Sequence, residues 1–559
     1  MNDNMVEIFC KNNGVKKMYP AGISLLEIYK DLNLQLKYGV TAAKENNKVK
    51  DLKFRVYKPK TVEFIGVDSP AGMRTYVRSL CFVLYKAVKE TLPGARLRIE
   101  HPISKGYYCQ VTKADKSPLT EKEVAAIKEA MKKCIQQDLP FEMETISSQE
   151  AIELFQKENA TDKINLISSL HSLYTNVYKL GDVCDYYYGS LLPSTGYLNI
   201  FDLITYHDGM LLQIPNRTRP DQLESFIKQE KIFHTFAEQT EWNAIMKVNN
   251  VGEINLAVAD KKSRAINSLI KIAEALQDKK IAKIADMIKE RKTARIVLIA
   301  GPSSSGKTTF SKKLSIQLSV NALRPVAISL DDYFIRRKDT PLDENGDYDF
   351  ESIYALDLDL FNKQMTQLLA GEEIELPYYN FETGEREYRG NRISLKPDDI
   401  LVIEGIHGLN PELTKMIPEE KKFKIYISAL TTLSLDDHNW IPMSDNRLLR
   451  RIVRDYKYRG YSAEETIHRW GKVREGEEKW IFPYQENADA IFNSALLFEI
   501  PVIKKYAEPI LMEVPCDCVE YAEAFRLLKF LRYFINVPDN EIPMTSVLRE
   551  FVGGSSFEY

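Results

Sequence analysis

A glycine- and serine-rich loop lies just past the midpoint of the chain, within the stretch LIAGPSSSGKTTFSKKL at residues 298–314. It follows the apolar run IVLIA and precedes a segment with helical patterning, so its backbone N–H groups can turn toward phosphate oxygens beside a helix N-terminus. Lys307 is expected to reach the β- and γ-phosphates of a nucleoside triphosphate, and the Thr308 hydroxyl to ligate Mg²⁺. The residues expected to bind the nucleotide are Gly301, Pro302, Ser303, Ser304, Ser305, Gly306, Lys307, Thr308 and Thr309.

Carboxylates follow two further apolar stretches in the same region. PVAISL is predicted to be a buried strand and is followed by Asp331 and Asp332, while LVIEG closes with Glu404. In an open parallel sheet, ligands bind outside the carboxyl ends of the strands. One of the two aspartates is expected to accept the proton of an attacking hydroxyl or to help hold Mg²⁺, and helix N-capping is the structural alternative for both. Glu404 is expected to act on the metal or on its bound water.

An arginine-rich segment, RLLRRIVRDYKYRG at residues 447–460, is predicted to be a helix that opens into a glycine-containing turn. Phosphoryl transfer requires cationic groups that neutralise the transferring group, and a lid that closes over ATP supplies them while excluding water. An exposed helix with i,i+4 pairs to acids would account for some of these cations instead. The arginines concerned are Arg447, Arg450, Arg451, Arg454 and Arg459.

The order of these motifs resembles that of the uridine kinase and phosphoribulokinase family, and the resemblance covers roughly residues 293–500. The segments that carry it are GPSSSGKTT, SLDDYF, DFESIYALDLDLF, LPYYNF, LVIEGI and RLLRRIVRD. The resemblance implies a P-loop domain with a doubly wound parallel sheet and ATP and Mg²⁺ as cofactors. It also implies transfer of the γ-phosphoryl group of ATP to the ribose 5′-hydroxyl of a nucleoside such as uridine.

The same resemblance implies roles for individual residues. Asp331 takes the place of the catalytic aspartate that activates the sugar hydroxyl, and Arg451 and Arg454 take the places of arginines that contact phosphates. Glu351 falls where an acidic residue holds ribose hydroxyls, and Tyr379 falls where an aromatic ring contacts the nucleobase. With Lys307, these residues are the expected catalytic and substrate-binding set.

Two positions depart from the family pattern. Gly384 stands where uridine-cytidine kinases carry a base-reading histidine, and Tyr461 stands where a further arginine is expected. A buried polar edge without a partner costs about 1–3 kcal/mol, so the acceptor is open at this point. The alternatives are a nucleoside, a non-nucleoside sugar or sugar phosphate as in phosphoribulokinase, and a regulatory RNA- or nucleotide-binding protein that uses ATP turnover as a switch.

The first half of the chain is predicted to hold two α+β modules. Residues 1–62, with two short strands around a helix and an excess of lysine and arginine, resemble a TGS domain. Residues 63–245 resemble the editing domain that follows it in threonyl-tRNA synthetases, and the TEKE segment at 120–123 fits a helix capping box. These modules are expected to sense a ligand, to contact RNA or to serve only as a scaffold, and the partner considered for the first two roles is tRNA, rRNA or a nucleotide effector. Residues 246–292 are predicted to be a helical linker, and 501–559 a helical extension.

The hydrolytic site of an editing domain needs the two pairs H-x-x-x-H and C-x-x-x-H. The resemblance places the first pair on Arg78 and Phe82 and the second on Tyr187 and Leu191, none of which can do that chemistry. We therefore expect this site to be inactive. His101 and Cys109 lie nearby in the sequence without rebuilding the spacing, and they are expected to be core or surface residues.

The composition fits a multidomain α/β protein. The chain has 559 residues, 44% of them hydrophobic, and a net charge of −3, which gives no global bias toward nucleic acid or membrane. No apolar run approaches the length of a membrane span, so a cytoplasmic protein is expected. Assembly into a homo-oligomer is a further expectation from the family resemblance.

Overall fold

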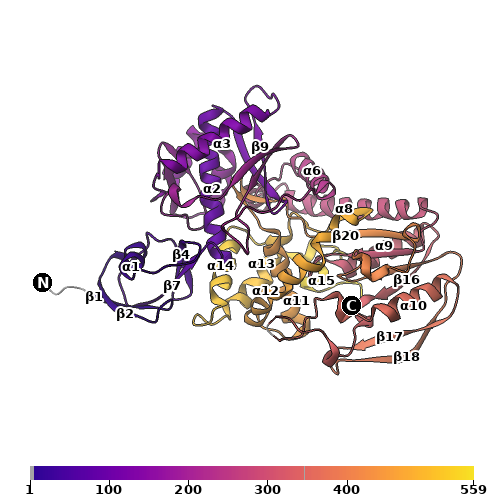
Figure 1. Ribbon diagram of the computed structural model, residues 1–559. Helices are drawn as coiled ribbons and strands as arrows, with labels where there is room; N and C mark the ends of the chain where they lie inside the picture. The colour runs from indigo at the N-terminus through magenta and orange to yellow at the C-terminus, as the bar shows by residue number, and fades with distance from the viewer. Residues whose placement is uncertain (1–4, 345, 559) are drawn as a thin grey trace.

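The structure, a computed structural model, describes residues 5–344 and 346–558. The predicted ranges 1–62 and 501–559 each include terminal residues, 1–4 and 559, that lie outside the described residues. Figure 1 shows a small N-terminal module, a second α+β domain beside it, and a larger α/β part formed by the second half of the chain. The multidomain α/β fold class predicted from the sequence is confirmed. Among the described helices, none combines the length and apolar character needed to cross a membrane.

The N-terminal module is a mixed sheet covered by one short helix. Its strands, in sheet order, are β2 (Lys16–Pro20), β1 (Met5–Cys10), β7 (Lys60–Gly66), β4 (Val40–Glu45) and β5 (Lys48–Lys50). Helix α1 (Leu25–Asp31) begins at a capping box in which Ser24 and Glu27 satisfy each other's backbone N–H groups. A short pair, β3 (Ile23–Ser24) and β6 (Arg55–Val56), closes the module. The predicted boundary at residue 62 falls inside β7.

The second domain is built around a long buried helix, α2 (Pro70–Thr91), which packs on an antiparallel sheet and on α3 (Glu121–Gln136). The sheet order is β13 (Asp202–Tyr206), β14 (Gly209–Gln213), β9 (Gly106–Thr112) and β8 (Arg96–Ile103). A second sheet holds β10 (Glu142–Ser147), β11 (Tyr174–Leu180) and β12 (Val183–Asp185), with α4 (Ser148–Lys157) and α5 (Thr161–Leu170) beside it. The capping box predicted at Thr120 and Glu123 is present at the start of α3.

Three helices connect the halves: α6 (Glu230–Ile245), α7 (Val251–Ala259) and α8 (Ala265–Glu290). The first part of α8 contributes Leu269 and Ile270 to an apolar cluster shared with the second domain. Its last part contributes Ile281 and Ile284 to the core under the second half's parallel sheet. Helix α8 is therefore packed against both halves, one at each end.

The second half contains a parallel sheet with helices on both faces. Its order is β16 (Arg324–Ser329), β19 (Asp399–Glu404), β15 (Ile296–Ala300), β20 (Lys422–Ser428) and β23 (Ala490–Asn493). Alternate residues of the central strand β15 face opposite sides: Val297 and Ile299 pack with α8 and α9 (Lys307–Val320), while Ile296 and Leu298 pack with α10 (Leu358–Leu369). The chain leaves β15 toward β16 on one side and later returns to β20 on the other, so the strand order reverses at β15.

The strand predicted as buried in PVAISL is β16, and that part of the prediction is wrong. β16 lies at the edge of the sheet and pairs only with β19, so most of its side chains are partly exposed. A hairpin, β17 (Ile374–Asn380) and β18 (Glu385–Ile393), extends beside α10 (Figure 1).

Helices near the C-terminus join the halves. They are α11 (Met443–Arg459), α12 (Ala463–Trp480), α13 (Glu499–Met512), α14 (Tyr521–Leu531) and α15 (Arg549–Val552). Apolar residues of α5, α7, α11, α13 and α14 form one cluster. Beside it, the buried ammonium of Lys163 lies 3.0 Å from Asp185 and 3.2 Å from Asp436, a residue of the second half. The predicted boundary at residue 500 falls inside α13.

Candidate active site

The phosphate loop links β15 to α9 at the point where the strand order reverses, which is where open α/β sheets bind ligands. Two glycines are required there. At Gly301 a Cβ atom would collide with the carbonyl oxygen of Ile427, and Gly306 has a left-handed backbone with φ of +84°. At Gly301 the loop therefore lies too close to neighbouring backbone for a larger residue. The loop ends where α9 begins, so its N–H groups lie beside the N-terminus of that helix.

Lys307 is the first residue of α9 and folds back over the loop. Its ammonium group donates to the carbonyl oxygens of Gly301 at 3.1 Å and Pro302 at 3.2 Å. Burial lowers the pKa of Lys307, and the negative charges of Glu404, Glu550 and Asp331 act in the opposite direction. The cation thus lies among carboxylates at the carboxyl edge of the sheet.

Thr308 and Glu404 meet across the ends of α9 and β19. The Thr308 hydroxyl donates to the Glu404 carboxylate at 3.0 Å. Burial raises the pKa of Glu404 to about 7, because desolvation disfavours the carboxylate and Lys307 offsets this only in part. A hydroxyl and a carboxylate are hard oxygen donors of the kind that Mg²⁺ prefers, so the two residues predicted from the sequence fit a magnesium ion.

Asp331 and Asp332 have different surroundings. The helix that follows β16 is N-capped by Ser329, whose hydroxyl accepts from the Asp331 amide, so neither aspartate fills that role. Asp332 accepts from the backbone N–H of Tyr379 at 3.3 Å and thereby anchors β17. Asp331 is accessible to solvent although protein surrounds it closely, and this crowding raises its pKa while Lys307 and Arg459 lower it. Asp331 is thus the aspartate whose charge acts on the loop cation.

The arginines of α11 divide into two groups. Arg447 and Arg450 are buried, and each forms a bidentate ion pair, with Glu477 and Glu499 respectively. Each also donates to a carbonyl oxygen of the phosphate loop, at Ser303 and Ser304. For these two arginines the expectation of a mobile cationic lid is wrong, because α11 is packed into the apolar cluster and turns this face inward.

Arg451 and Arg454 are the partly exposed members of the set. Arg451 donates to the Ser303 hydroxyl at 2.8 Å and pairs with Asp455, which also holds Arg454 at 2.8 Å. Arg451 therefore contacts the loop, Arg454 is held beside it by their shared partner Asp455, and both side chains retain access to solvent. Arg469 lies 4.3 Å from the ring of Tyr461, the residue that replaces the further arginine of the family pattern.

The residues assigned to the acceptor are held by packing. Glu351 packs against Gly476 of α12, and burial together with the charge of Glu477 raises its pKa to about 7. Tyr379 is only 3% exposed, and its ring lies 5.4 Å from Phe334 and 5.0 Å from Phe381. The structure thus brings Glu351 toward Arg451, while it places the Tyr379 ring in an aromatic cluster.

Gly384 explains why a base-reading histidine has no place here. Its φ is +72°, and a Cβ atom would lie 2.8 Å from the Cβ of Arg337. Arg337 fills this space and donates to the carbonyl oxygen of Phe381. A guanidinium group thus occupies the region beside Tyr379 where the imidazole is expected.

Two carboxylates at the loop have no counterpart in the sequence analysis. Glu477 of α12 accepts from the Ser303 amide at 3.0 Å. Glu550 of α15 accepts from the Thr309 amide at 3.1 Å and from the Thr309 hydroxyl at 2.7 Å. An isolated glutamate in a polar helix carries no local signal, so only the folded chain brings them to the loop.

Comparison with known proteins agrees with this geometry. The Phosphoribulokinase / Uridine kinase family profile matches residues 296–499. Uridine kinase of Staphylococcus aureus is 30% identical over 202 residues, which are 36% of this chain and 87% of that protein. The chain belongs to this family. The solved structure of a possible uridine kinase from Bacillus stearothermophilus is 22% identical with a TM-score of 0.25, and the match covers 36% of this chain and 89% of that one.

The family accounts for the second half only. The N-terminal region is similar to threonine–tRNA ligases, and that of Desulforamulus reducens is 32% identical over 202 residues, which are 36% of this chain. The chain spans 31% of the length of that ligase. The fusion of family domain and ligase-like region predicted from the sequence is confirmed.

The four positions on which the resemblance places the two editing pairs are all buried. Phe82 and Tyr187 have ring centroids 5.3 Å apart, and Tyr187 and Arg78 line the same cavity. His101 stacks on Phe236 at 3.9 Å and its pKa falls to about 3 through burial, while Cys109 is fully buried. Both are core residues, as expected.

The pKa of Glu404 predicts how metal affinity depends on pH. A Mg²⁺ ion held by Glu404 would need the ionised carboxylate, so Mg²⁺ affinity in the presence of a non-hydrolysable ATP analogue should rise about tenfold from pH 6 to pH 8. The same pKa also affects folding stability. The carboxyl group of Glu404 binds its proton more tightly in the folded protein than in the unfolded chain, so the free energy of unfolding should fall as pH rises from 4.5 to about 7. Calorimetric titration measures the affinity, and Glu404→Gln should remove its dependence on pH. An unchanged pH profile in that variant would assign the proton elsewhere.

Proposed function

We propose that the protein is an ATP- and Mg²⁺-dependent kinase that transfers the γ-phosphoryl group to the 5′-hydroxyl of a nucleoside such as uridine. The observation that carries this proposal is the position of Asp331, a solvent-accessible residue just beyond the carboxyl end of β16 whose charge acts on Lys307. Family membership supports the reaction type, and the relative named uridine kinase supports the choice of acceptor.

In the proposed reaction, Asp331 accepts the proton of the attacking hydroxyl, and its raised pKa brings it nearer the optimum for a base at neutral pH. The loop amides and Lys307 hold the triphosphate in line with that hydroxyl. Arg451 and Arg454 neutralise charge that spreads over the transferring group. Thr308 and Glu404 would hold Mg²⁺, which supplies charge neutralisation on the β- and γ-phosphates when it is bound.

The acceptor is tested directly by product formation. Purified protein with Mg-ATP is supplied with uridine, cytidine, adenosine, ribose and ribulose 5-phosphate, and phosphorylated product is measured by mass spectrometry. Formation of a nucleoside 5′-monophosphate supports the proposal. ATP hydrolysis without phosphorylation of any acceptor would refute it.

A sugar phosphate is the second candidate, and one observation favours it. Arg337 fills the space beside Gly384 and Tyr379, and a guanidinium group is a better partner for a phosphate than for a pyrimidine edge. Phosphorylation of ribulose 5-phosphate in preference to all nucleosides would establish this alternative.

Glu550 is expected to compete with the nucleotide for the loop. Its carboxylate accepts both donors of Thr309 and adds negative charge beside Lys307. Glu550→Ala should therefore tighten ATP binding about 2- to 10-fold, the range expected for freeing one or two hydrogen-bond donors. Equilibrium binding of a fluorescent ATP analogue measures this, and Glu541→Ala, at an exposed glutamate of the same tail, is the control. Weaker ATP binding by Glu550→Ala would instead make this residue a support of the loop.

A further inference from the structure

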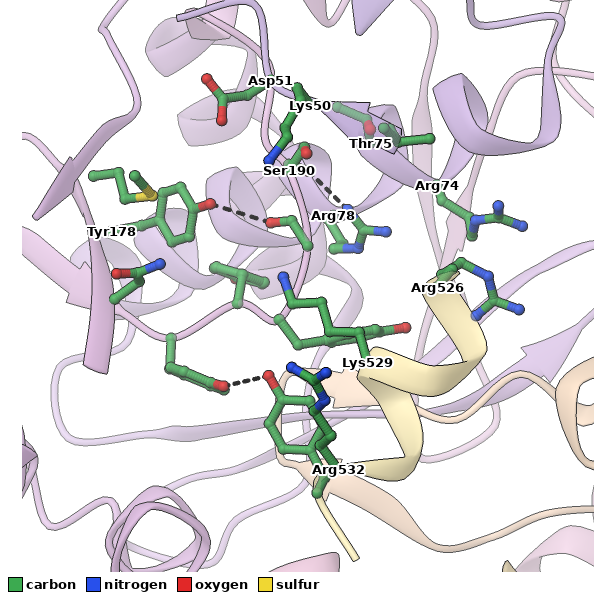
Figure 2. A pocket seen from close by; sticks show the side chains of 18 of the residues that line it. Lys50, Asp51, Arg74, Thr75, Arg78, Tyr178, Ser190, Arg526, Lys529 and Arg532 are labelled. Carbon is green, nitrogen blue, oxygen red and sulfur yellow. Dashed lines mark hydrogen bonds between the residues drawn. The ribbon is translucent and has the colours of Figure 1, made fainter. Parts of the chain in front are cut away.

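A cavity of about 680 Å³ lies apart from the phosphate loop, where the N-terminal module, the second domain and helix α14 meet. Figure 2 shows Lys50 and Asp51 from the first of these, Arg78 and Ser190 from the second, and Lys529 and Arg532 from α14 and its end. Its volume falls in the range of small-molecule sites, which is roughly 300–1,000 Å³.

The lining is strongly basic. Its six basic side chains face a single acidic one, Asp51. Two of the six already have partners outside the lining: Arg74 pairs with Glu523 at 3.0 Å, and Arg526 pairs with Asp445 at 2.7 Å. The other four have no carboxylate partner among the described residues, and they are Lys50, Arg78, Lys529 and Arg532.

Arg78 is the deepest of these cations. Only 8% of it is exposed, and its guanidinium group donates to the carbonyl oxygen of Ser190 at 2.7 Å. The backbone makes room for it at Gly189, where a Cβ atom would collide with the guanidinium group. A buried arginine normally has a carboxylate beside it. Arg78 has none among the described residues, so its position suits the binding of an anion from solution.

Lys529 adds to the same positive field. Lys529 is accessible to solvent, but protein surrounds it closely, and this crowding lowers its pKa; the charges of Arg78, Lys50 and Arg532 lower the pKa further. Figure 2 shows the ammonium group of Lys529 directed toward the space between Arg78 and Arg532. Like charges gathered in one concavity repel one another, and a bound anion relieves that repulsion.

Aromatic rings complete the lining. Phe54, Tyr174, Tyr188 and Phe525 are all partly or largely accessible there, and the guanidinium of Arg78 lies 5.3 Å from the Tyr188 ring. Such rings stack on planar heterocycles, and nucleobases of any sequence share that property. The lining contains no histidine or cysteine, so the cavity is equipped for binding rather than for the hydrolysis expected of an editing site.

We infer that this cavity binds a nucleotide carrying two or more phosphates, with the phosphates at Arg78 and Lys529 and the base against the aromatic rings. Several phosphates suit the four cations without partners, and the rings suit a base that inorganic phosphate lacks. This site is separate from the proposed kinase site and does not depend on it.

The test measures how many nucleotides the full-length protein binds. Equilibrium dialysis with radiolabelled ADP and GDP is expected to show two sites in the unmodified protein and one in Arg78→Met. Lys529 is accessible to solvent, so Lys529→Met should not disturb folding, and it should weaken nucleotide binding at the cavity about 10- to 100-fold. Lys271→Met, an exposed lysine outside the lining, should leave both sites unchanged. Lys307→Met should weaken only the site at the phosphate loop, which separates this inference from the proposed function.

Three outcomes would overturn the inference. The first is a single site whose affinity neither Arg78→Met nor Lys529→Met changes. The second is pyrophosphate displacing labelled nucleotide as well as unlabelled nucleotide does, since the base would then contribute nothing. The third is binding of bulk tRNA that both variants weaken while free nucleotides do not bind, which would make the cavity part of an RNA surface.

Discussion

Asp331→Asn is expected to lower kcat for phosphoryl transfer by about 10²- to 10⁴-fold while leaving the Kd for ATP within about twofold. Asparagine keeps the shape of the side chain but cannot accept the proton of the acceptor hydroxyl. The charges of Lys307 and Arg459 act on this carboxylate, and its backbone amide, which the substitution keeps, is the group that donates to Ser329. The loss should therefore appear in turnover and not in stability.

The neighbouring aspartate provides a matched control. Asp332→Asn keeps an oxygen that accepts from the Tyr379 amide, so it should retain most of the wild-type kcat. Rapid-quench measurement of product formation at saturating ATP distinguishes the two variants. Normal turnover in Asp331→Asn together with a large loss in Asp332→Asn would reverse the assignment.

Residues in short motifs were predictable because one strand or one turn positions them. Lys307 and Thr308 follow a buried strand within a single loop, and Glu404 closes the strand beside it. Two apolar runs of the right length therefore determined that Thr308 and Glu404 would meet. The choice between Asp331 and Asp332 required the resemblance, because local sequence does not say which carboxylate turns toward the loop.

The supports of the loop could not be predicted in this way. Glu477 and Glu550 contact the loop directly, and Glu499 acts on it through Arg450. All three lie more than 150 residues further along the chain, and a glutamate on a helix is usually a solvated residue. The edge position of β16 was missed for a related reason, since an apolar stretch does not reveal how many neighbours a strand will have.

Domain boundaries show the same limit. The predicted boundary at residue 62 falls inside β7, and the one at residue 500 falls inside α13. Both elements carry apolar residues on each side of the predicted boundary, so the sequence pattern does not change there. The chain also uses α14 twice: it lines the basic cavity, and through Arg526 it holds Asp445 at the start of α11. Helix α11 also carries Arg451, which contacts the phosphate loop. Helix α14 therefore contacts both halves, although the sequence pattern assigns it to one domain alone.

Arg450→Met is expected to destabilise the protein by about 3–5 kcal/mol, the cost of leaving a buried charge without its partner. Arg450 and Glu499 are both fully buried, and the guanidinium also donates to the carbonyl oxygens of Ser304 and Ser494. Removing it leaves the Glu499 carboxylate without its cation and the Ser304 carbonyl oxygen without this donor. Urea unfolding followed by tryptophan fluorescence measures the loss, and the altered loop should also weaken ATP binding.

The double variant Arg450→Met/Glu499→Gln isolates the charge as the cause. It removes both charges and keeps an oxygen that accepts from the Leu496 amide, so it should be more stable than Arg450→Met alone. Arg392→Met, which breaks an exposed pair with Glu373, should change stability by less than about 1 kcal/mol. A double variant less stable than Arg450→Met would mean that side-chain volume, and not the unpaired charge, dominates at this site. In that case Arg450 would support the phosphate loop through the volume of its side chain, and ATP binding should recover with a larger apolar residue at position 450.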